Sequence, residues 1–123
     1  MIRVVLVDDH LEFRWITRCL LALDPELEVV GEAGNGLEAL DVVAQIQPDV
    51  VLMDVQMPLL DGIATTKRMR VAYPDVQIVL FTGGDDGAVL DGVRAGAVRY
   101  LCKTTPQAEL VAALRAAHRP NSP

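Results

Sequence analysis

The sequence predicts an α/β fold, a doubly wound five-stranded parallel sheet with helices on both faces. Two observations predict it. Short apolar segments typical of buried strands alternate with segments of helical pattern along the whole chain. Such alternation favours parallel strands joined by right-handed helical crossovers. The 123 residues suffice for one domain with a single core, which we expect to cover residues 1–118 and to leave 119–123 as a tail or the start of a linker.

The predicted strands are short and mostly apolar, as strands buried on both faces are. They cover residues 3–7, 28–33, 50–53, 77–81 and 98–102. The second segment is the least purely apolar, which indicates a position nearer the edge of the sheet.

The predicted helices are bounded by proline, glycine or capping residues. They cover residues 11–23 before Pro25, 37–46 before Pro48, 62–72 before Pro74, 86–95 before Gly96, and a last segment to about 118 with Thr105 as N-cap and Pro106 in its first turn. The fourth helix is expected to be weak, because Gly87 and Gly92 each cost up to ~1 kcal/mol relative to alanine.

Composition narrows the range of functions. The net charge of −6 disfavours non-specific binding to nucleic acid. No apolar run approaches the ~20 residues that a membrane-spanning helix needs, and the first residues enter a strand rather than a signal peptide. We therefore expect a cytoplasmic protein without a membrane partner, in which Cys19 and Cys102 are reduced thiols in or near the core.

The stretch from Val50 to Gly62 carries the acid around which the chain is organised. Asp54 directly follows the buried segment 50–53, so we expect it at the carboxyl end of a strand, where open α/β sheets place their ligand sites. Pro58 keeps the residue before it out of the helical region, and Asp61-Gly62 permits a tight turn into the next helix. A role for Asp54 as a mere helix cap is disfavoured, because these loop residues separate it from any helix.

Other reactive side chains follow the neighbouring strands. Asp8 and Asp9 come after the first strand, Thr82 after the fourth and Lys103 after the fifth. Because these strand ends lie along one edge of the sheet, we expect the side chains in a single pocket. Clustered carboxylates repel one another unless a cation enters, and oxygen ligands suit Mg²⁺. A carboxylate can attack as a nucleophile to form an aspartyl phosphate, with Lys103 and Thr82 holding the phosphoryl oxygens.

This layout resembles the receiver domain of two-component response regulators over about residues 2–118. The resemblance rests on Asp8-Asp9, Asp54, Met57-Pro58, Asp61-Gly62, Thr82, Tyr100 and Lys103. The segments VLVDDH, EVVGEAGNGLEAL and AGAVRYLCK are most similar to the NarL/LuxR branch, whose members carry a C-terminal helix-turn-helix DNA-binding domain after a linker. The resemblance implies a flavodoxin-like (CheY-like) strand order of 2-1-3-4-5. Gly83-Gly84 and Thr104 depart from the common pattern without removing a reacting group, and they leave the lifetime of a phosphorylated form open.

The resemblance also implies a phosphorylation-activated signalling function. A sensor histidine kinase would donate a phosphoryl group to Asp54, and Thr82 and Tyr100 would move on activation. Mg²⁺ would be held by four groups: Asp8, Asp9, Asp54 and the backbone carbonyl of Gln56. The expected output is transcription, with DNA contacted only through a domain that this chain lacks. Such a receiver is a phosphoacceptor that catalyses its own phosphotransfer and slowly loses the phosphoryl group, rather than an enzyme.

Three other interpretations stay open at this point. A phosphohydrolase resembling the haloacid dehalogenases needs a DxD motif after the first strand, where this chain has Asp8-Asp9-His10, and multiple turnover of a phosphate ester would indicate it. A flavodoxin-like FMN binder needs a phosphate loop there, and a yellow solution would indicate it. A degenerate receiver that serves only as a scaffold would lack part of the site. His10 is a weak candidate metal ligand, because carboxylates and water already satisfy Mg²⁺.

The first and last predicted helices offer a face for a homodimer formed on activation. The inward stripe of the first helix is Phe13, Ile16, Thr17, Leu20 and Leu23. Trp15 then points to solvent, with Leu11 and Cys19 beside it. The last helix has the inward residues Leu110, Leu114 and Ala117. Its outward stripe of Ala108, Ala112 and Ala116 would form a shallow groove beside Trp15, a residue type enriched at interface hot spots. The alternative face consists of the fourth helix, the fifth strand and the fifth helix.

Overall fold

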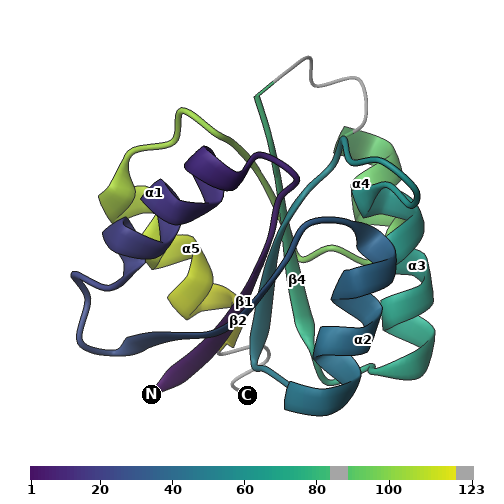
Figure 1. Ribbon diagram of the computed structural model, residues 1–123, viewed down its shortest axis with the longest axis horizontal. Helices are drawn as coiled ribbons and strands as arrows, with labels where there is room; N and C mark the ends of the chain where they lie inside the picture. Colours follow the sequence, from purple (N-terminus) through teal and green to yellow (C-terminus); the bar gives the residue numbers. More distant parts are fainter. Residues whose placement is uncertain (84–88, 119–123) are drawn as a thin grey trace.

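A single parallel sheet forms the centre of the computed structural model, which describes residues 1–83 and 89–118 (Figure 1). Its strands are β1 (Ile2–Val7), β2 (Leu27–Ala33), β3 (Val50–Asp54), β4 (Gln77–Thr82) and β5 (Arg99–Cys102). They are ordered β2-β1-β3-β4-β5, and each neighbouring pair is parallel. The predicted class and strand order are therefore confirmed, as is the edge position of the second strand.

Helices cover both faces of the sheet. They are α1 (Leu11–Leu21), α2 (Gly36–Ile46), α3 (Gly62–Ala72), α4 (Val89–Ala95) and α5 (Gln107–His118). In Figure 1, α1 and α5 lie on one side of the sheet, and α2, α3 and α4 lie on the other. This arrangement is the doubly wound fold that alternating strands and helices predict.

Two hydrophobic cores lie on opposite sides of the sheet. Val5 and Val7 of β1 belong to the core beneath α2 and α3, whereas Val4 and Leu6 belong to the core beneath α1 and α5. Alternate residues of the central strands thus point to opposite faces, and both faces are covered. This explains why every residue of β3 is buried and why its sequence is an unbroken apolar run ending in Asp54.

Some boundaries differ from the expected ones. Asp54 and Thr82 are the last residues of β3 and β4, not the residues after them, and α1 ends at Leu21. In α5 the N–H of Leu110 donates to the carbonyl of Pro106 at 3.0 Å, so Pro106 precedes the first helical residue instead of lying within the first turn. The start of the predicted fourth helix, residues 86–88 with Gly87, lies outside the described residues.

Helix α1 is rotated relative to the expected inward stripe. Phe13, Thr17 and Leu21 face the sheet, whereas Ile16 is 49% exposed, Leu20 is 36% exposed and Leu23, beyond the helix end, is 71% exposed. The prediction was wrong for these three residues, and Arg14 is drawn inward instead. Its Nη1 donates to the Asp8 carbonyl at 2.7 Å and its Nε to Glu32 Oε1 at 2.9 Å.

The cysteines were also misplaced. Cys19 and Cys102 are free thiols, as expected, but both are exposed rather than in the core. Cys19 lies on the outer side of α1, and Cys102 ends the edge strand β5, whose residues are only partly covered. Among the described residues, no helix combines the length and the apolar character needed to cross a membrane.

Candidate functional site

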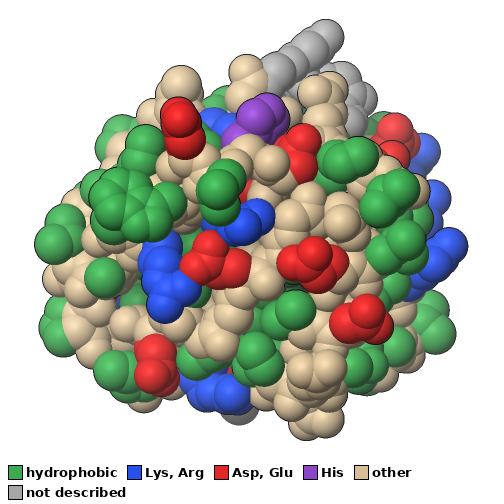
Figure 2. Space-filling model, viewed as in Figure 1, with side chains coloured by type: hydrophobic (Ala, Val, Ile, Leu, Met, Phe, Trp, Pro, Cys, Tyr) green, Lys and Arg blue, Asp and Glu red, His purple; other side chains and the backbone are tan. Residues whose placement is uncertain are grey.

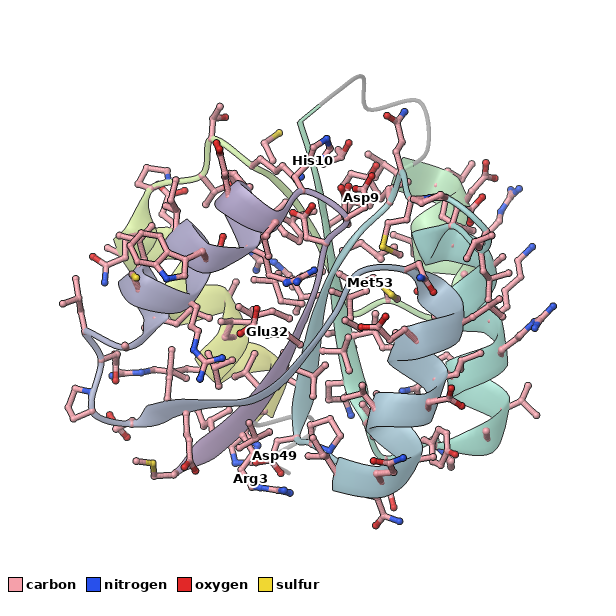
Figure 3. All side chains as sticks on the ribbon, viewed as in Figure 1. Arg3, Asp9, His10, Glu32, Asp49 and Met53 are labelled. Atoms are coloured by element: carbon pink, nitrogen blue, oxygen red, sulfur yellow. The ribbon has the colours of Figure 1, made fainter. Side chains whose placement is uncertain are left out.

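The carboxyl ends of the strands meet at one edge of the sheet and surround a cavity of about 560 Å³. Its lining residues are Asp9, His10, Asp54, Gln56, Thr82, Gly83 and Lys103. Figure 3 shows Asp9 and His10 at this edge and Arg3 and Asp49 at the opposite one. The parallel register pairs Asp54 with Phe81 and Thr82 with Cys102, so these strand ends are level. The predicted gathering of side chains from separate strands is confirmed.

The loop between β3 and α3 holds Asp54 in place. The N–H of Gln56 donates to Asp54 Oδ1 at 3.2 Å, and the N–H of Gly62 donates to the Val55 carbonyl at 2.8 Å. A Cβ on Gly62 would lie 2.2 Å from the Asp54 carbonyl oxygen, so only glycine allows this approach. Asp61 caps α3 by accepting the N–H of Ala64 at 2.8 Å. The Asp61-Gly62 pair therefore brings the start of α3 against the end of β3.

Lys103 joins two buried carboxylates across the cavity. Its Nζ lies 2.8 Å from Asp8 Oδ2 and 3.1 Å from Asp54 Oδ2. The two acids are 1% and 3% exposed respectively. The N–H of Lys103 donates to the Thr82 carbonyl at 2.8 Å, which fixes the base of the lysine side chain at the end of β5.

Burial and charge act in opposite directions on these groups. Burial raises the pKa of Asp54 above its ordinary value and the charge of Asp8 adds to this, although Lys103 and the Gln56 N–H oppose the effect. Burial by itself would lower the pKa of Lys103, but hydrogen bonds to Asp8 and Asp54 and their charges outweigh it, so the net shift is upward. Lys103 is thus a firmly charged cation beside an acid that is costly to ionise.

The acidic cluster has the donor chemistry of a metal site. Ligand atoms of Asp8, Asp9, His10 and Asp54 all lie within 4.8 Å of one another. Asp8 Oδ2 is buried, and its polar contact among the described residues is the ion pair with the Lys103 ammonium. An oxygen atom left in this state suits a hard cation, and carboxylates are the ligands that Mg²⁺ prefers. The residues present therefore fit Mg²⁺.

The ring of His10 contacts two of the acids and is largely exposed. Its Nδ1 lies 3.3 Å from Asp8 Oδ1 and 3.3 Å from Asp9 Oδ1, and its side chain is 67% exposed. Its backbone N–H donates to Asp8 Oδ1 at 2.8 Å, which orients that carboxylate. The backbone contact is shorter than the contacts of the ring, and it does not depend on the side chain at position 10.

The two predicted switch residues lie on neighbouring strands. Thr82 is buried at the end of β4, and Tyr100 is half-buried on β5 against the core beneath α2 and α3. A Cβ on Gly92 of α4 would lie 3.1 Å from Tyr100 Cδ2 and 3.0 Å from Leu80 Cδ1. Packing thus explains the glycine in α4, because its lack of a side chain lets the helix lie close to the ring of Tyr100.

Sequence reasoning missed a supporting contact at the end of β1. Arg14 binds the backbone carbonyl of Asp8 and the carboxylate of Glu32, and Arg18 pairs with the same carboxylate. These contacts tie α1 to the ends of β1 and β2 and so fix the backbone on which Asp8 sits. The only sequence signal for this contact was a basic residue six positions after Asp8. That signal is weak, because charged helix residues are usually solvated.

The predicted interface residues are exposed, as expected. Leu11 is 66% and Trp15 is 65% exposed, and hydrophobic side chains gather over α1 in Figure 2. Ala108 and Ala112 of α5 are also exposed. A cleft of about 230 Å³ lies where α1 and α5 meet, and Ile16, Leu20, Gln107 and Leu110 are among its lining residues. The exposure of the two stripes is therefore correct, whereas their use in a dimer is a separate question.

Comparisons with known proteins give consistent matches over most of the chain. Residues 4–115 match the response regulator receiver domain family. The transcriptional regulatory protein LiaR of Bacillus subtilis is 41% identical over 120 residues, which are 97% of this chain and 57% of LiaR. A protein-glutamate methylesterase/protein-glutamine glutaminase of a Nocardioides strain is 46% identical over 105 residues, which are 83% of this chain and 29% of that protein.

The fold agrees with solved structures as well. The receiver domain of the putative response regulator NarL from Mycobacterium tuberculosis superposes with a TM-score of 0.92 at 32% identity, covering 98% of both chains. The chain spans about half the length of the transcriptional regulators it matches.

Proposed function

This chain belongs to the response regulator receiver domain family, and we propose that Asp54 is its phosphoacceptor. The observation that carries the proposal is the ion pair of Lys103 with Asp54 and Asp8 inside an open cavity. A carboxylate oxygen of Asp54 attacks the phosphorus of a donor, the bond from phosphorus to the donor's leaving group breaks, and an acyl phosphate forms on Asp54. Burial raises the pKa of Asp54, and the ion pair with Lys103 opposes this effect and favours the ionised carboxylate that attacks.

Mg²⁺ fits the same cavity and would be held by Asp8, Asp9, Asp54 and the backbone carbonyl of Gln56. When bound, the metal neutralises the negative charge of the phosphoryl group. Lys103 supplies a point charge to a phosphoryl oxygen, a role that suits an ammonium group. For this Lys103 gives up its ion pair with Asp8, which then serves as a metal ligand. The hydroxyl of Thr82, at the end of the adjoining strand, donates to another phosphoryl oxygen.

The resulting change of charge is the signal. Thr82 and Tyr100 lie on neighbouring strands, and the ring of Tyr100 lies against Gly92 of α4. A movement of Thr82 toward the phosphoryl group would free space into which Tyr100 and α4 can shift. The chain itself acts as a phosphoacceptor with self-catalysed phosphotransfer and slow loss of the phosphoryl group, not as a multiple-turnover enzyme.

The relatives support the proposed partners. In the cytoplasm, a cognate sensor histidine kinase would supply the phosphoryl group. LiaR is named as a transcriptional regulator, so an output at DNA through a helix-turn-helix domain outside this chain is the favoured one. The methylesterase relative, of which the match covers 29%, shows that similar receivers also accompany an enzyme.

The test is phosphorylation by a small phosphodonor such as acetyl phosphate, followed by intact-protein mass spectrometry. We expect one phosphoryl group per chain in the presence of Mg²⁺ and none after chelation. The Asp54→Asn variant should stay unmodified, while the matched Asp49→Asn variant, at the opposite edge of the sheet, should react like the wild type. Equal modification of wild type and Asp54→Asn would refute the proposal.

A further inference from the structure

The ammonium group of Lys103 has two kinds of partner. It lies near the carboxylates of Asp8 and Asp54, at 2.8 and 3.1 Å. It also lies over two aromatic rings, with the Nζ 4.5 Å from the ring centroid of Phe13 and 5.3 Å from that of Phe81. A cation over a ring face within about 6 Å is attracted by the ring quadrupole. The rings therefore attract the ammonium in addition to the carboxylates.

The rings reach Lys103 from separate elements. Phe13 lies on the inward side of α1 and is half-buried, and Phe81 lies near the end of β4 and is 5% exposed. Their centroids are 5.8 Å apart with the planes inclined by 33°. Both line the cleft between α1 and α5, together with the stem of Lys103, whose side chain is 13% exposed. The rings thus form part of the apolar wall beside the ammonium, where little water competes with the attraction.

We propose that Phe13 and Phe81 are positioning residues that hold the Lys103 ammonium at the phosphorylation site. This rests on the proposed function, in which Lys103 leaves Asp8 for a phosphoryl oxygen. A lone pair is a directional acceptor, whereas a ring face attracts a cation over a broad area. The ammonium can therefore exchange one oxygen for another while the rings remain its constant partners. Without the rings the flexible lysine stem would have to be ordered during the reaction, at a cost in entropy.

A competing explanation is that the two rings only fill the core between α1 and β4. Fluorination separates the two explanations, because it withdraws electron density from the ring face while nearly preserving the ring's shape. The whole chain contains two phenylalanines, so biosynthetic replacement of phenylalanine alters these rings alone. We expect the phosphorylation rate with acetyl phosphate to fall stepwise from the natural ring through 4-fluoro and 3,5-difluoro to 3,4,5-trifluoro, by about two- to fivefold in all.

A second measurement does not require phosphorylation. In the wild type, protons on the ε carbon of Lys103 lie near ring faces, so their NMR signals should be shifted upfield from those of free lysine. Phe13→Leu should move them back and slow phosphorylation, whereas Phe13→Tyr should keep both properties. The control is Leu110→Ala, which removes apolar bulk from the same cleft but no aromatic ring, and it should leave the Lys103 signals in place.

Each outcome decides the proposal. An ordinary lysine shift in the wild type, or one that survives Phe13→Leu, would overturn it, as would a rate that is constant across the fluorinated series. A rate that falls equally in Leu110→Ala and Phe13→Leu would assign the effect to packing. If the wild type accepts no phosphoryl group at all, the proposed function fails, and the Lys103 shift still decides whether the rings hold the ammonium.

Discussion

Asp9 and Lys103 line the same cavity but suit different partners. The Asp9 carboxylate is 28% exposed and belongs to the acidic cluster, whereas Lys103 Nζ forms an ion pair with Asp8 Oδ2. We expect Asp9→Ala to lower Mg²⁺ affinity by at least about tenfold, as lost metal partners do. Lys103→Ala removes a competing cation, so it should bind Mg²⁺ at least as well as the wild type but respond weakly to the phosphodonor. Calorimetric titration measures both affinities, and an equal loss in the two variants would contradict this division of roles.

Asp54 should destabilise the unphosphorylated fold at neutral pH. Its pKa in the folded protein is raised, mainly by burial, so between the unfolded and folded pKa values the native state binds more protons than the unfolded state. Stability attributable to this residue is then present at low pH and decreases as the pH rises through that window. Asp54→Asn should therefore be more stable than the wild type at pH 7, and the difference should shrink on acidification below the unfolded pKa. Urea unfolding at several pH values checks the sign, which would be reversed if the Lys103 ion pair outweighed burial.

At the level of single residues, the sequence predicted which polar side chains gather in the cavity and missed the contacts that support them. The grouping of Asp8, Asp54, Thr82 and Lys103 could be predicted, because each follows or ends a strand and parallel strands end at one edge of a sheet. The contacts of Phe13 and Arg14 could not be predicted, because they depend on how far α1 is rotated about its axis. A helical pattern locates an apolar side only broadly, and here the hydrogen bonds of Arg14 decide the rotation.

Among the elements, the strands were predicted better than the helix faces. An unbroken apolar run such as that of β3 has one explanation in this fold, burial on both faces. Ile16 and Leu23 have no such constraint, because apolar side chains at the margin of a helix can be buried or exposed. Cys102 was misjudged for a related reason, since its strand is at the edge of the sheet and is covered only in part.

Helix α4 is the element most suited to move. Its described part, Val89–Ala95, has seven residues, compared with eleven in α3, and it contains Gly92, whose lack of a side chain accommodates Tyr100. A glycine inside a helix costs about 1 kcal/mol, which corresponds to roughly fivefold more frequent opening. We expect the amides of α4 to exchange at least about that much faster than those of α3, and to slow on phosphorylation. Hydrogen exchange by NMR measures both helices, and uniform protection in both states would exclude α4 as the moving element.

At the scale of the molecule, two of the apolar surfaces formed by the described residues are candidates for self-association. One is on α1, where Leu11, Trp15 and Ile16 are exposed, and the other is on α4 and the segment leading into β5, where Leu90, Val93 and Val98 are exposed. Isolated exposed aromatics are common, but these residues are adjacent along one helix side and are visible as a hydrophobic area over α1 in Figure 2. The dimer therefore stays a prediction, with α1 and α5 as the favoured face.

Substitution on each surface separates the two faces. Trp15→Ala should raise the dissociation constant of a phosphorylated dimer by about tenfold or more, because truncating a tryptophan at a hot spot costs on the order of 2 kcal/mol. The matched variant Val93→Ala and the variant Arg99→Ala should change it little. Sedimentation velocity with and without phosphodonor gives the association state. If Trp15→Ala leaves association unchanged and Val93→Ala or Arg99→Ala abolishes it, the face of α4, β5 and α5 is the one used.

One acid among the three, Asp54, is proposed to receive the phosphoryl group. Borohydride reduces an acyl phosphate to an alcohol, so treatment of the phosphorylated protein converts the modified aspartate into homoserine, which peptide mass spectrometry can locate. The predicted result is homoserine at position 54, dependent on Mg²⁺ and on the phosphodonor, with Asp8 and Asp9 unchanged. Homoserine at position 8 or 9, with Asp54 intact, would contradict the account of the site.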